Sequence, residues 1–265
     1  MSVPERYRGR MRALMDGPDG ILGCFCLLPS PFAAEMLGRA GFDFVVVDNQ
    51  HGLAGRTETT AMLLALEATG TPALLRPPVN SPELIGWALD AGAQGVVIPM
   101  VSSADDVRAA VAACRYPPGG GRSWGPLRLL PADSTFSIAR ENRDVVCIAM
   151  IETQEGLDNL DEIVTVDGLD AVLIGQGDLA LALGLDPVTG QNDAVHHIGA
   201  VERIRDAIHA QGRTAIIQCN NVAQAVEWRS RGFRAVSVGS DLAYLLQRAR
   251  EVVAAAGRPS LIGVP

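Results

Sequence analysis

Residues 42–52 read FDFVVVDNQHG. The run Phe44–Asp48 is apolar up to its last residue, and polar side chains follow it directly. A run of this length that is apolar at consecutive positions is typical of a parallel strand covered on both faces. Ligands of parallel α/β folds bind at the carboxyl ends of such strands. The positions of similar runs along the chain therefore decide both the fold and the place to look for a site.

Eight runs of this kind occur, and they are Ile21–Leu28, Phe44–Asp48, Ala73–Arg76, Gly95–Pro99, Val146–Glu152, Ala171–Gly175, Thr214–Cys219 and Ala235–Gly239. Stretches with helical patterning lie between and after them, namely Pro31–Ala40, Glu58–Ala68, Pro82–Ala91, Ala104–Cys114, Val195–Gln211, Val222–Ser230 and Asp241–Ala256. Thr57, Ser81 and Ser103 each precede one of these stretches as candidate N-caps. Strand–helix alternation repeated in this way predicts a (β/α)8 (TIM) barrel. The alternative is a doubly wound sheet, but no Gly-x-Gly-x-x-Gly sequence follows the first run to support it.

The composition indicates one domain and argues against two classes of partner. The chain has 265 residues, 48% of them hydrophobic, which is enough to bury one large core, so we expect a single barrel domain over residues 1–265. Its formal charge of −8 argues against a nucleic-acid partner and against an anionic membrane surface. The sequence has no run of about 18 consecutive apolar residues, so no membrane span is expected.

Two residue types narrow the chemistry further. All 22 residues counted as Lys or Arg are arginine, which excludes Schiff-base aldolase chemistry and a P-loop lysine. The five cysteines are scattered and show no zinc-finger spacing, so we expect buried thiols in a reducing cytoplasm: Cys24, Cys26, Cys114, Cys147 and Cys219.

Polar residues collect where the expected strands end. Asp48 and His51 follow the second strand, Arg76 ends the third, Glu152 follows the fifth and Asp178 follows the sixth. These ends meet at one mouth of a barrel, which is where its active site lies. Carboxylates with open positions for further oxygen ligands suit Mg²⁺ or Mn²⁺. Arg76 stands among apolar residues and needs an anion, which could be a substrate or a structural partner.

Each of these residues also has a plainer interpretation. Glu152 could cap a helix, and Asp178 could be the N-cap of a helix over Leu179–Leu183. His51 could be a base oriented by Asp48, or a turn residue with no role. The remaining histidines are expected on the surface of a helix: His196, His197 and His209.

Five segments in order resemble the HpcH/HpaI class II aldolases, which include 4-hydroxy-2-oxoheptanedioate and 2-keto-3-deoxy-sugar-acid aldolases. The segments are Phe42–Gly52, Leu75–Pro78, Ala88–Met100, Ala149–Leu160 and Gly175–Gly184. The resemblance covers roughly residues 20–240. It implies a TIM barrel that makes or breaks 4-hydroxy-2-oxo acids through a pyruvate or hydroxypyruvate enolate, releasing or accepting an aldehyde.

The resemblance also implies roles for the polar residues at the mouth. Glu152 and Asp178 would hold a divalent cation, Mg²⁺, Mn²⁺ or Co²⁺. Arg76 would bind the keto oxygen and stabilise the enolate. His51, oriented by Asp48, would act as the base through a water molecule.

Further implications concern the substrate carboxylate and the assembly. The backbone of Gly177 and Asp178 would receive the carboxylate, and Asp90 matches a position that reaches into the neighbouring subunit's site. The family implies dimers with exchanged C-terminal helices, often assembled as hexamers. Acceptor specificity would come from the loop over Arg115–Asp144 and from neighbouring subunits.

Two departures from the family pattern bear on the substrate more than on the reaction class. Gln50 stands where many members have Glu, and Gln176-Gly177 stands where many have Pro-Ala. The alternatives are an oxaloacetate decarboxylase or an enolate-based carbon–carbon-forming synthase on the same site, a citrate-lyase-like acyl-CoA lyase, and a barrel that binds a metabolite without catalysis.

Overall fold

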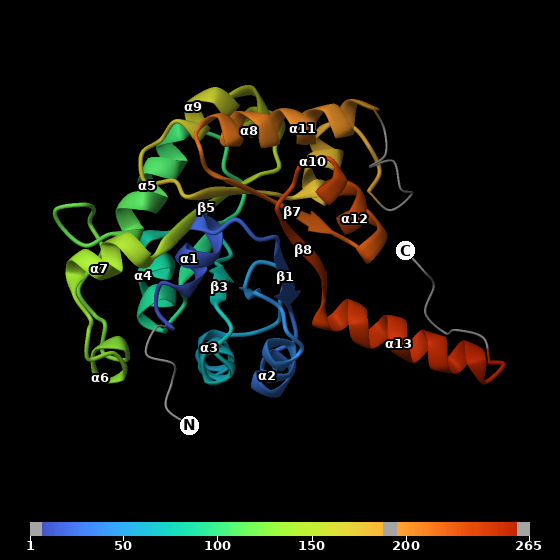
Figure 1. The fold of residues 1–265 in the computed structure, drawn as a ribbon, viewed down its shortest axis with the longest axis horizontal. Helices are drawn as coiled ribbons and strands as arrows, with labels where there is room; N and C mark the ends of the chain where they lie inside the picture. Colours follow the sequence, from blue (N-terminus) through green and yellow to red (C-terminus); the bar gives the residue numbers. More distant parts are fainter. Residues whose placement is uncertain (1–6, 188–194, 259–265) are drawn as a thin grey trace.

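Eight parallel strands close into a barrel in the order of the sequence (Figure 1). The structure, a computed structural model, describes residues 7–187 and 195–258, so both ends of the expected domain 1–265 lie outside the described residues. The strands are β1 (Ile21–Cys26), β2 (Phe44–Asp48), β3 (Ala73–Arg76), β4 (Gly95–Ile98), β5 (Val146–Ile151), β6 (Ala171–Ile174), β7 (Thr214–Cys219) and β8 (Ala235–Ser240). The expected (β/α)8 barrel is confirmed, and each predicted strand lies within two residues of an observed one.

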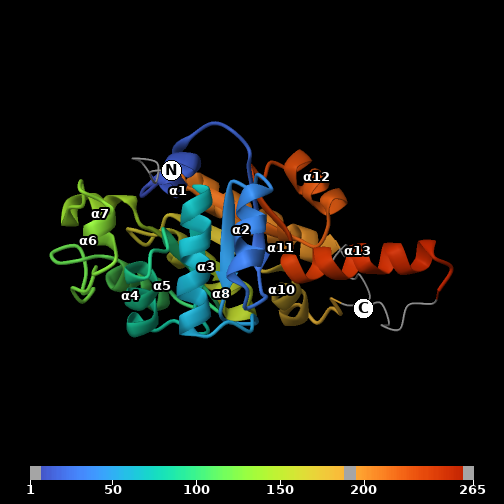
Figure 2. The ribbon, with the colours of Figure 1, turned by 90° about the horizontal axis from the view of Figure 1, so that it is seen from below.

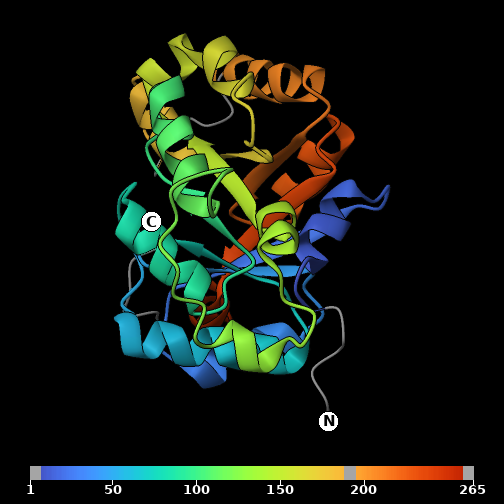
Figure 3. The same cartoon turned by 90° about the vertical axis from the view of Figure 1, so that its left-hand side faces the viewer.

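Helices surround the barrel, and Figure 3 shows blue and cyan helices on one side of the strands and yellow and orange helices on the other. They are α1 (Arg10–Asp16), α2 (Pro31–Arg39), α3 (Arg56–Thr69), α4 (Pro82–Asp90), α5 (Ala104–Cys114), α6 (Leu129–Ala132), α7 (Ile138–Asp144), α8 (Gln154–Asp158), α9 (Leu160–Val164), α10 (Gln176–Ala182), α11 (Val195–Ala210), α12 (Val222–Ser230) and α13 (Asp241–Ala255). Ser81 and Ser103 cap α4 and α5 as predicted. Thr57 does not cap α3, because that helix already begins at Arg56 and Gly55 occupies the N-cap position.

Alternate residues of each strand point in opposite directions, and this divides the core into two layers. Inside the barrel, Phe44 and Val46 of β2 pack with Ile148 and Met150 of β5 in one buried cluster. The residues between them pack outward against the helices in a second, larger cluster. The two-residue repeat therefore carries the next inward position of each strand to the mouth of the barrel.

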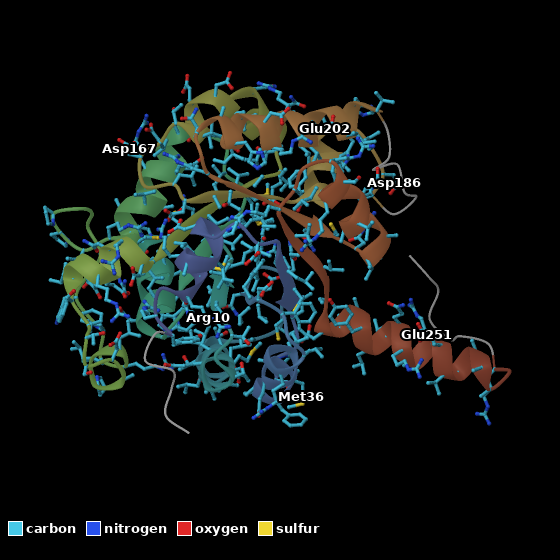
Figure 4. The ribbon with its side chains drawn as sticks, viewed as in Figure 1. Arg10, Met36, Asp167, Asp186, Glu202 and Glu251 are labelled. Atoms are coloured by element: carbon cyan, nitrogen blue, oxygen red, sulfur yellow. The ribbon has the colours of Figure 1, made fainter. Side chains whose placement is uncertain are left out.

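Helix α13 leaves the barrel and projects away from it, as Figures 1 and 2 both show. Asp241, at its start, is its only buried residue among those described, and Figure 4 shows Glu251 on the projecting part. Four large apolar side chains of α13 are exposed: Leu242, Leu245, Val252 and Val253. The expected exchange of a C-terminal helix between subunits stays a prediction for which this helix is the candidate.

The segment between α5 and β5 is anchored by buried ion pairs. Arg122 donates to Glu141 at 2.9 Å and to Asp90 at 2.6 Å, and the Arg122 guanidinium lies over the Tyr116 ring. The segment also forms α6 and α7, which the sequence did not predict. Being an α-to-β connection, it lies at the end of the barrel opposite the mouth, so it does not line the mouth of its own chain.

Two further expectations can be compared with the structure. All five cysteines are buried and have free thiols, as expected. Within residues 7–187 and 195–258, no helix has the length and apolar content needed to cross a bilayer.

Candidate active site

The strand repeat brings three ionisable side chains to the mouth of the barrel. Asp48 and Arg76 are the last residues of β2 and β3 and are direct register partners. Glu152 follows Met150 by two positions, so its side chain continues the inward row of β5. All three side chains are nearly fully buried. Polar groups at this depth need partners, and those partners define what the site can do.

Arg76 and Asp48 form a two-point ion pair. The Nε of Arg76 donates to Oδ1 of Asp48 at 2.8 Å, and Nη2 donates to Oδ2 at 2.7 Å. The guanidinium also lies over the Phe25 ring, 5.0 Å from its centroid, and Nη1 is 3.6 Å from the Met150 sulfur. Sulfur is a weak acceptor, so Nη1 is the part of the guanidinium left for a ligand. The structural-partner interpretation of Arg76 is thus observed, and it leaves room for a substrate contact.

Asp48 holds the backbone of His51, not its ring. Oδ1 of Asp48 accepts from the backbone N–H of Gln50 at 3.0 Å and of His51 at 3.4 Å. Arg76 occupies both carboxylate oxygens, and the His51 ring makes no hydrogen bond with any residue that the structure describes. His51 is exposed at the rim of the mouth. The predicted orientation of the ring by Asp48 is therefore not the contact that is found.

Glu152 is held by one oxygen only. Its Oε1 accepts from the backbone N–H of Met100 at 2.8 Å, and Met100 adopts a left-handed backbone with φ 55°. Its Oε2 is buried and finds no hydrogen-bond partner in the described part of the chain. The helix-cap interpretation is wrong, because Thr153 caps α8 through its side chain.

Asp178 lies in the first turn of α10, whose start is packed against Glu152. A Cβ on Gly175, the residue before α10, would come within 2.2 Å of Glu152 Oε2, so only glycine allows this approach. Asp178 is not the N-cap of its helix, because α10 begins at Gln176. Asp178 is partly exposed toward solvent, unlike Glu152.

The electrostatics of Glu152 reflect this setting. Burial, followed by the nearby carboxylates of Asp178 and Asp48, raises the pKa of Glu152 to about 7, against the lowering effects of the Met100 N–H and of Arg76. Glu152 and Asp178 are therefore close enough for their charges to interact. No group of three or more His, Cys, Asp or Glu side chains gathers as a metal cage among the described residues. A carboxylate pair with one unpaired buried oxygen is, however, a donor set that Mg²⁺ accepts, since this ion is often bound by one or two carboxylates.

Asp90 does not join this cluster within one chain. It ends α4, close to Gly92 and Ala93, whose carbonyls accept from Arg8 at the start of the strands. Its carboxylate pairs with Arg122. Asp90 therefore does not line the mouth of its own chain, and the implied role in a neighbouring subunit stays a prediction.

His197 lies elsewhere than the sequence predicted. It was expected on a helix surface but is fully buried, while His196 and His209 are exposed as expected. A signal was available in the sequence, because His197 opens the buried row of α11 that continues through Ala200, Val201, Ile204 and Ile208. Its Nε2 is 3.3 Å from the backbone carbonyl of Gln176 at the start of α10.

Comparisons with known proteins show the family of this chain. Residues 22–248 match the model of the HpcH/HpaI aldolase/citrate lyase family. The chain is 39% identical to a hydroxypyruvate/pyruvate aldolase of Rhizorhabdus wittichii, over 86% of this chain and 90% of that protein. It is 31% identical to a 5-keto-4-deoxy-D-glucarate aldolase of Shigella dysenteriae, over 89% of this chain and 92% of that protein.

The fold is shared with solved structures as well. A HpcH/HpaI aldolase/citrate lyase family protein from Burkholderia cenocepacia has a TM-score of 0.86 and 28% identity, covering 94% of this chain and 98% of that one. The expectation of an aldolase-type lyase, drawn from the polar strand ends and the five matching segments, is confirmed by these relatives. The chain belongs to the HpcH/HpaI aldolase/citrate lyase family.

Proposed function

We propose that this chain catalyses reversible aldol cleavage of 4-hydroxy-2-oxo acids through an enolate of pyruvate or hydroxypyruvate. One observation carries the proposal: a buried carboxylate oxygen, Glu152 Oε2, has no hydrogen-bond partner among the described residues and lies against the turn that leads to Asp178. The relatives named as hydroxypyruvate/pyruvate aldolase and 5-keto-4-deoxy-D-glucarate aldolase support the same chemistry. The absence of lysine from the sequence supports a route without a Schiff base.

Glu152 and Asp178 would hold a divalent metal ion, which we take to be Mg²⁺, Mn²⁺ or Co²⁺. The residues fit such an ion, because Glu152 has a buried oxygen with no hydrogen-bond partner among the described residues, and burial together with the neighbouring carboxylates raises its pKa to about 7. When bound, the ion supplies Lewis acidity toward the carboxylate and keto oxygen of the substrate.

Arg76 would donate to the keto oxygen of the substrate. Its plane is fixed because Nε and Nη2 both bind Asp48, and among the described residues Nη1 contacts only the weakly accepting Met150 sulfur. A donor that is already oriented stabilises negative charge without reorganising during the reaction. Arg76 would therefore stabilise the enolate through Nη1 while Asp48 keeps the guanidinium in place.

His51 would take the proton of the 4-hydroxyl through a water molecule. Loss of that proton lets the C3–C4 bond break, so the aldehyde leaves and the electron pair of the bond enters the enolate. A proton then returns to C3, which becomes the methyl group of pyruvate or the hydroxymethyl group of hydroxypyruvate. The exposed ring at the rim and the backbone anchored by Asp48 suit a base that works between solvent and the buried cluster.

Gly177 and Asp178 would receive the substrate carboxylate through their backbone N–H groups. Gly177 is exposed, and a Cβ placed on it would meet nothing within 4 Å, so a ligand has room there. We further propose a homo-oligomer in which α13 packs on a second copy and Asp90 serves the neighbouring site. Such an assembly would cover the exposed apolar side chains of α13. The whole chain, 1–265, would act as one domain, and its free thiols suit the cytoplasm.

Methyl-proton exchange of pyruvate in D2O tests the proposal directly. Exchange should require Mn²⁺, Mg²⁺ or Co²⁺, should stop after treatment with EDTA, and should return when the metal is restored. Enolate formation and aldol cleavage that persist fully in metal-free protein would contradict the proposal. Product analysis with oxaloacetate distinguishes the alternative, since a decarboxylase releases CO2 and pyruvate without any aldehyde acceptor.

A further inference from the structure

The buried imidazole of His197 has a defined partner. His197 lies in the first turn of α11 with no exposed surface, and its Nε2 is 3.3 Å from the backbone carbonyl of Gln176. A carbonyl oxygen can only accept, so Nε2 carries the hydrogen and donates it. The remaining buried positions of α11 in the described residues are apolar, namely Ala200, Val201, Ile204 and Ile208. A polar ring placed in such a row costs stability unless its donor is used, so the contact with Gln176 has a structural purpose.

Gln176 is held from a second side as well. Its side-chain amide donates to the backbone carbonyl of Gln218 near the end of β7, and the side chain is buried. Helix α10 contacts both α11 and β7. The first residue of α10 is therefore held by both α11 and β7.

The clamped turn carries two contacts that the proposed reaction needs. Gly175 lies against Glu152 Oε2, and Asp178 follows in the first turn of α10. Any shift of the Gln176 carbonyl moves both the wall beside Glu152 and the carboxylate of Asp178. The relative placement of the two carboxylates thus depends on what holds Gln176.

We infer that His197 is a positioning residue that holds the Gly175–Asp178 turn, and through it the Asp178 carboxylate, in place for a divalent cation. The inference rests on the proposed function, because it assumes that Glu152 and Asp178 share the ion. His197 contacts neither the substrate nor the ion. It acts through the backbone of Gln176, two residues before the ligand.

The test compares two substitutions of His197 with one of its exposed neighbour. His197→Leu fills the space but removes the donor, whereas His197→Gln keeps an N–H donor at a similar reach. His196→Leu is the matched control, because His196 is exposed on the same turn of α11. The dissociation constant for Mn²⁺ alone is measured by titration calorimetry on each full-length protein, together with Tm and the kcat and KM for pyruvate methyl exchange.

We expect His197→Leu to weaken Mn²⁺ binding about tenfold, the lower end for residues that orient metal ligands. Saturating Mn²⁺ should restore most of its kcat, while His197→Gln and His196→Leu should bind Mn²⁺ within about threefold of the wild type. A merely structural role would lower Tm and leave the Mn²⁺ dissociation constant unchanged, which would overturn the inference. Should His197→Leu fail to fold, His197→Gln decides, because a tenfold loss of Mn²⁺ affinity in a folded protein that keeps the donor contradicts the inference.

The wild-type protein separates this inference from the proposed function. A wild type that binds no Mn²⁺ and exchanges no pyruvate protons refutes the proposed function itself. A wild type that does both, with a His197→Leu variant of equal Mn²⁺ affinity, refutes only the role of His197.

Discussion

Both carboxylate oxygens of Asp48 accept hydrogen bonds from the guanidinium of Arg76, across two strands that pair in direct register. Asp48 and Arg76 are 1% and 6% exposed, so both charges are largely removed from water. A buried charge that loses its partner is strongly destabilising, while a neutral pair of similar size is tolerated. The ion pair therefore contributes both to the stability of the barrel and to the fixed orientation of the Arg76 guanidinium.

Removing Arg76 alone should damage both stability and activity. Arg76→Met leaves Asp48 buried and unpaired, and we expect a loss of about 3–5 kcal/mol in the free energy of unfolding. We also expect kcat/KM for aldol cleavage to fall about 100- to 1000-fold, the size typical for one oxyanion donor. Urea unfolding and steady-state kinetics measure the two effects.

The double variant Asp48→Asn/Arg76→Met provides the control. It removes both charges, so much of the lost stability should return while activity stays low. Recovery of activity along with stability would mean that Arg76 serves only to hold Asp48.

Gly175→Ala should disturb Glu152 more than the fold. The added Cβ would lie 2.2 Å from Glu152 Oε2, so the carboxylate must move away from the turn that carries Asp178. We expect Mn²⁺ affinity to fall about tenfold or more, as is typical when a residue that orients a metal ligand is substituted. Gly199→Ala is the matched control, because its Cβ would meet nothing within 4 Å on α11. Equal Mn²⁺ affinities for the two variants would disprove this role for Gly175.

The pH dependence of metal binding should follow Glu152. Its pKa is raised to about 7, so below that pH a proton competes with the cation for the carboxylate. We expect Mn²⁺ affinity to rise about tenfold per pH unit up to pH 7 and then to level off. Calorimetric titrations between about pH 5.5 and about pH 8 would measure this pH dependence. Glu152→Gln should abolish the pH dependence and most of the Mn²⁺ binding.

The raised pKa of Glu152 also predicts how the stability of the metal-free protein depends on pH. Stability should fall with rising pH, whereas Mn²⁺ affinity rises. Its folded pKa lies above its ordinary value of 4.5, so the folded state holds the proton more tightly than the unfolded state does. Stability contributed by Glu152 is therefore present at low pH and is lost as the pH rises toward 7. Urea unfolding of metal-free wild type against Glu152→Gln should show this difference, and a wild type that gains stability relative to the variant over that range would contradict it.

Helix α13 should govern the oligomeric state. Leu245 is 59% exposed on the projecting helix, and a charge placed there should weaken association of copies. We expect Leu245→Arg to shift sedimentation toward a smaller species at the same protein concentration. Val226→Arg on α12 is the control, since Val226 is similarly exposed but lies on a helix that packs on the barrel. Unchanged sedimentation of Leu245→Arg would show that α13 does not hold the copies together.

The strands could be predicted from the sequence because both of their faces are buried. Each apolar run from Ile21 onward coincides with a strand to within two residues, since only a strand covered on both sides needs so continuous a pattern. Ser81 and Ser103 marked helix starts for an equally local reason, as their side chains bind the backbone three residues on. The prediction for Thr57 was wrong because α3 begins at Arg56, one residue earlier, with Gly55 at the N-cap position and no side-chain cap.

The partners inside the site could not be predicted in the same way. Asp48 lies three residues from His51 but pairs with Arg76, which is 28 residues away in the sequence. The register of β2 and β3, which places the two residues side by side, determines this pairing. His197 was assigned to the wrong face because histidine suits either side of an amphipathic helix, although its place in the apolar row of α11 indicated the buried side. Asp90 is the last residue of α4, so it lies at the end of the barrel opposite the mouth.

The support of Glu152 has a consequence for how this protein can evolve. The donor at residue 100 belongs to the main chain, so exchanging the methionine side chain cannot delete it, and proline is excluded by the positive φ as well as by its missing N–H. The Met100 side chain itself is 51% exposed beside the mouth. The side chain at position 100 can therefore change, and with it the surface beside the mouth, while the main-chain hydrogen bond to Glu152 is kept.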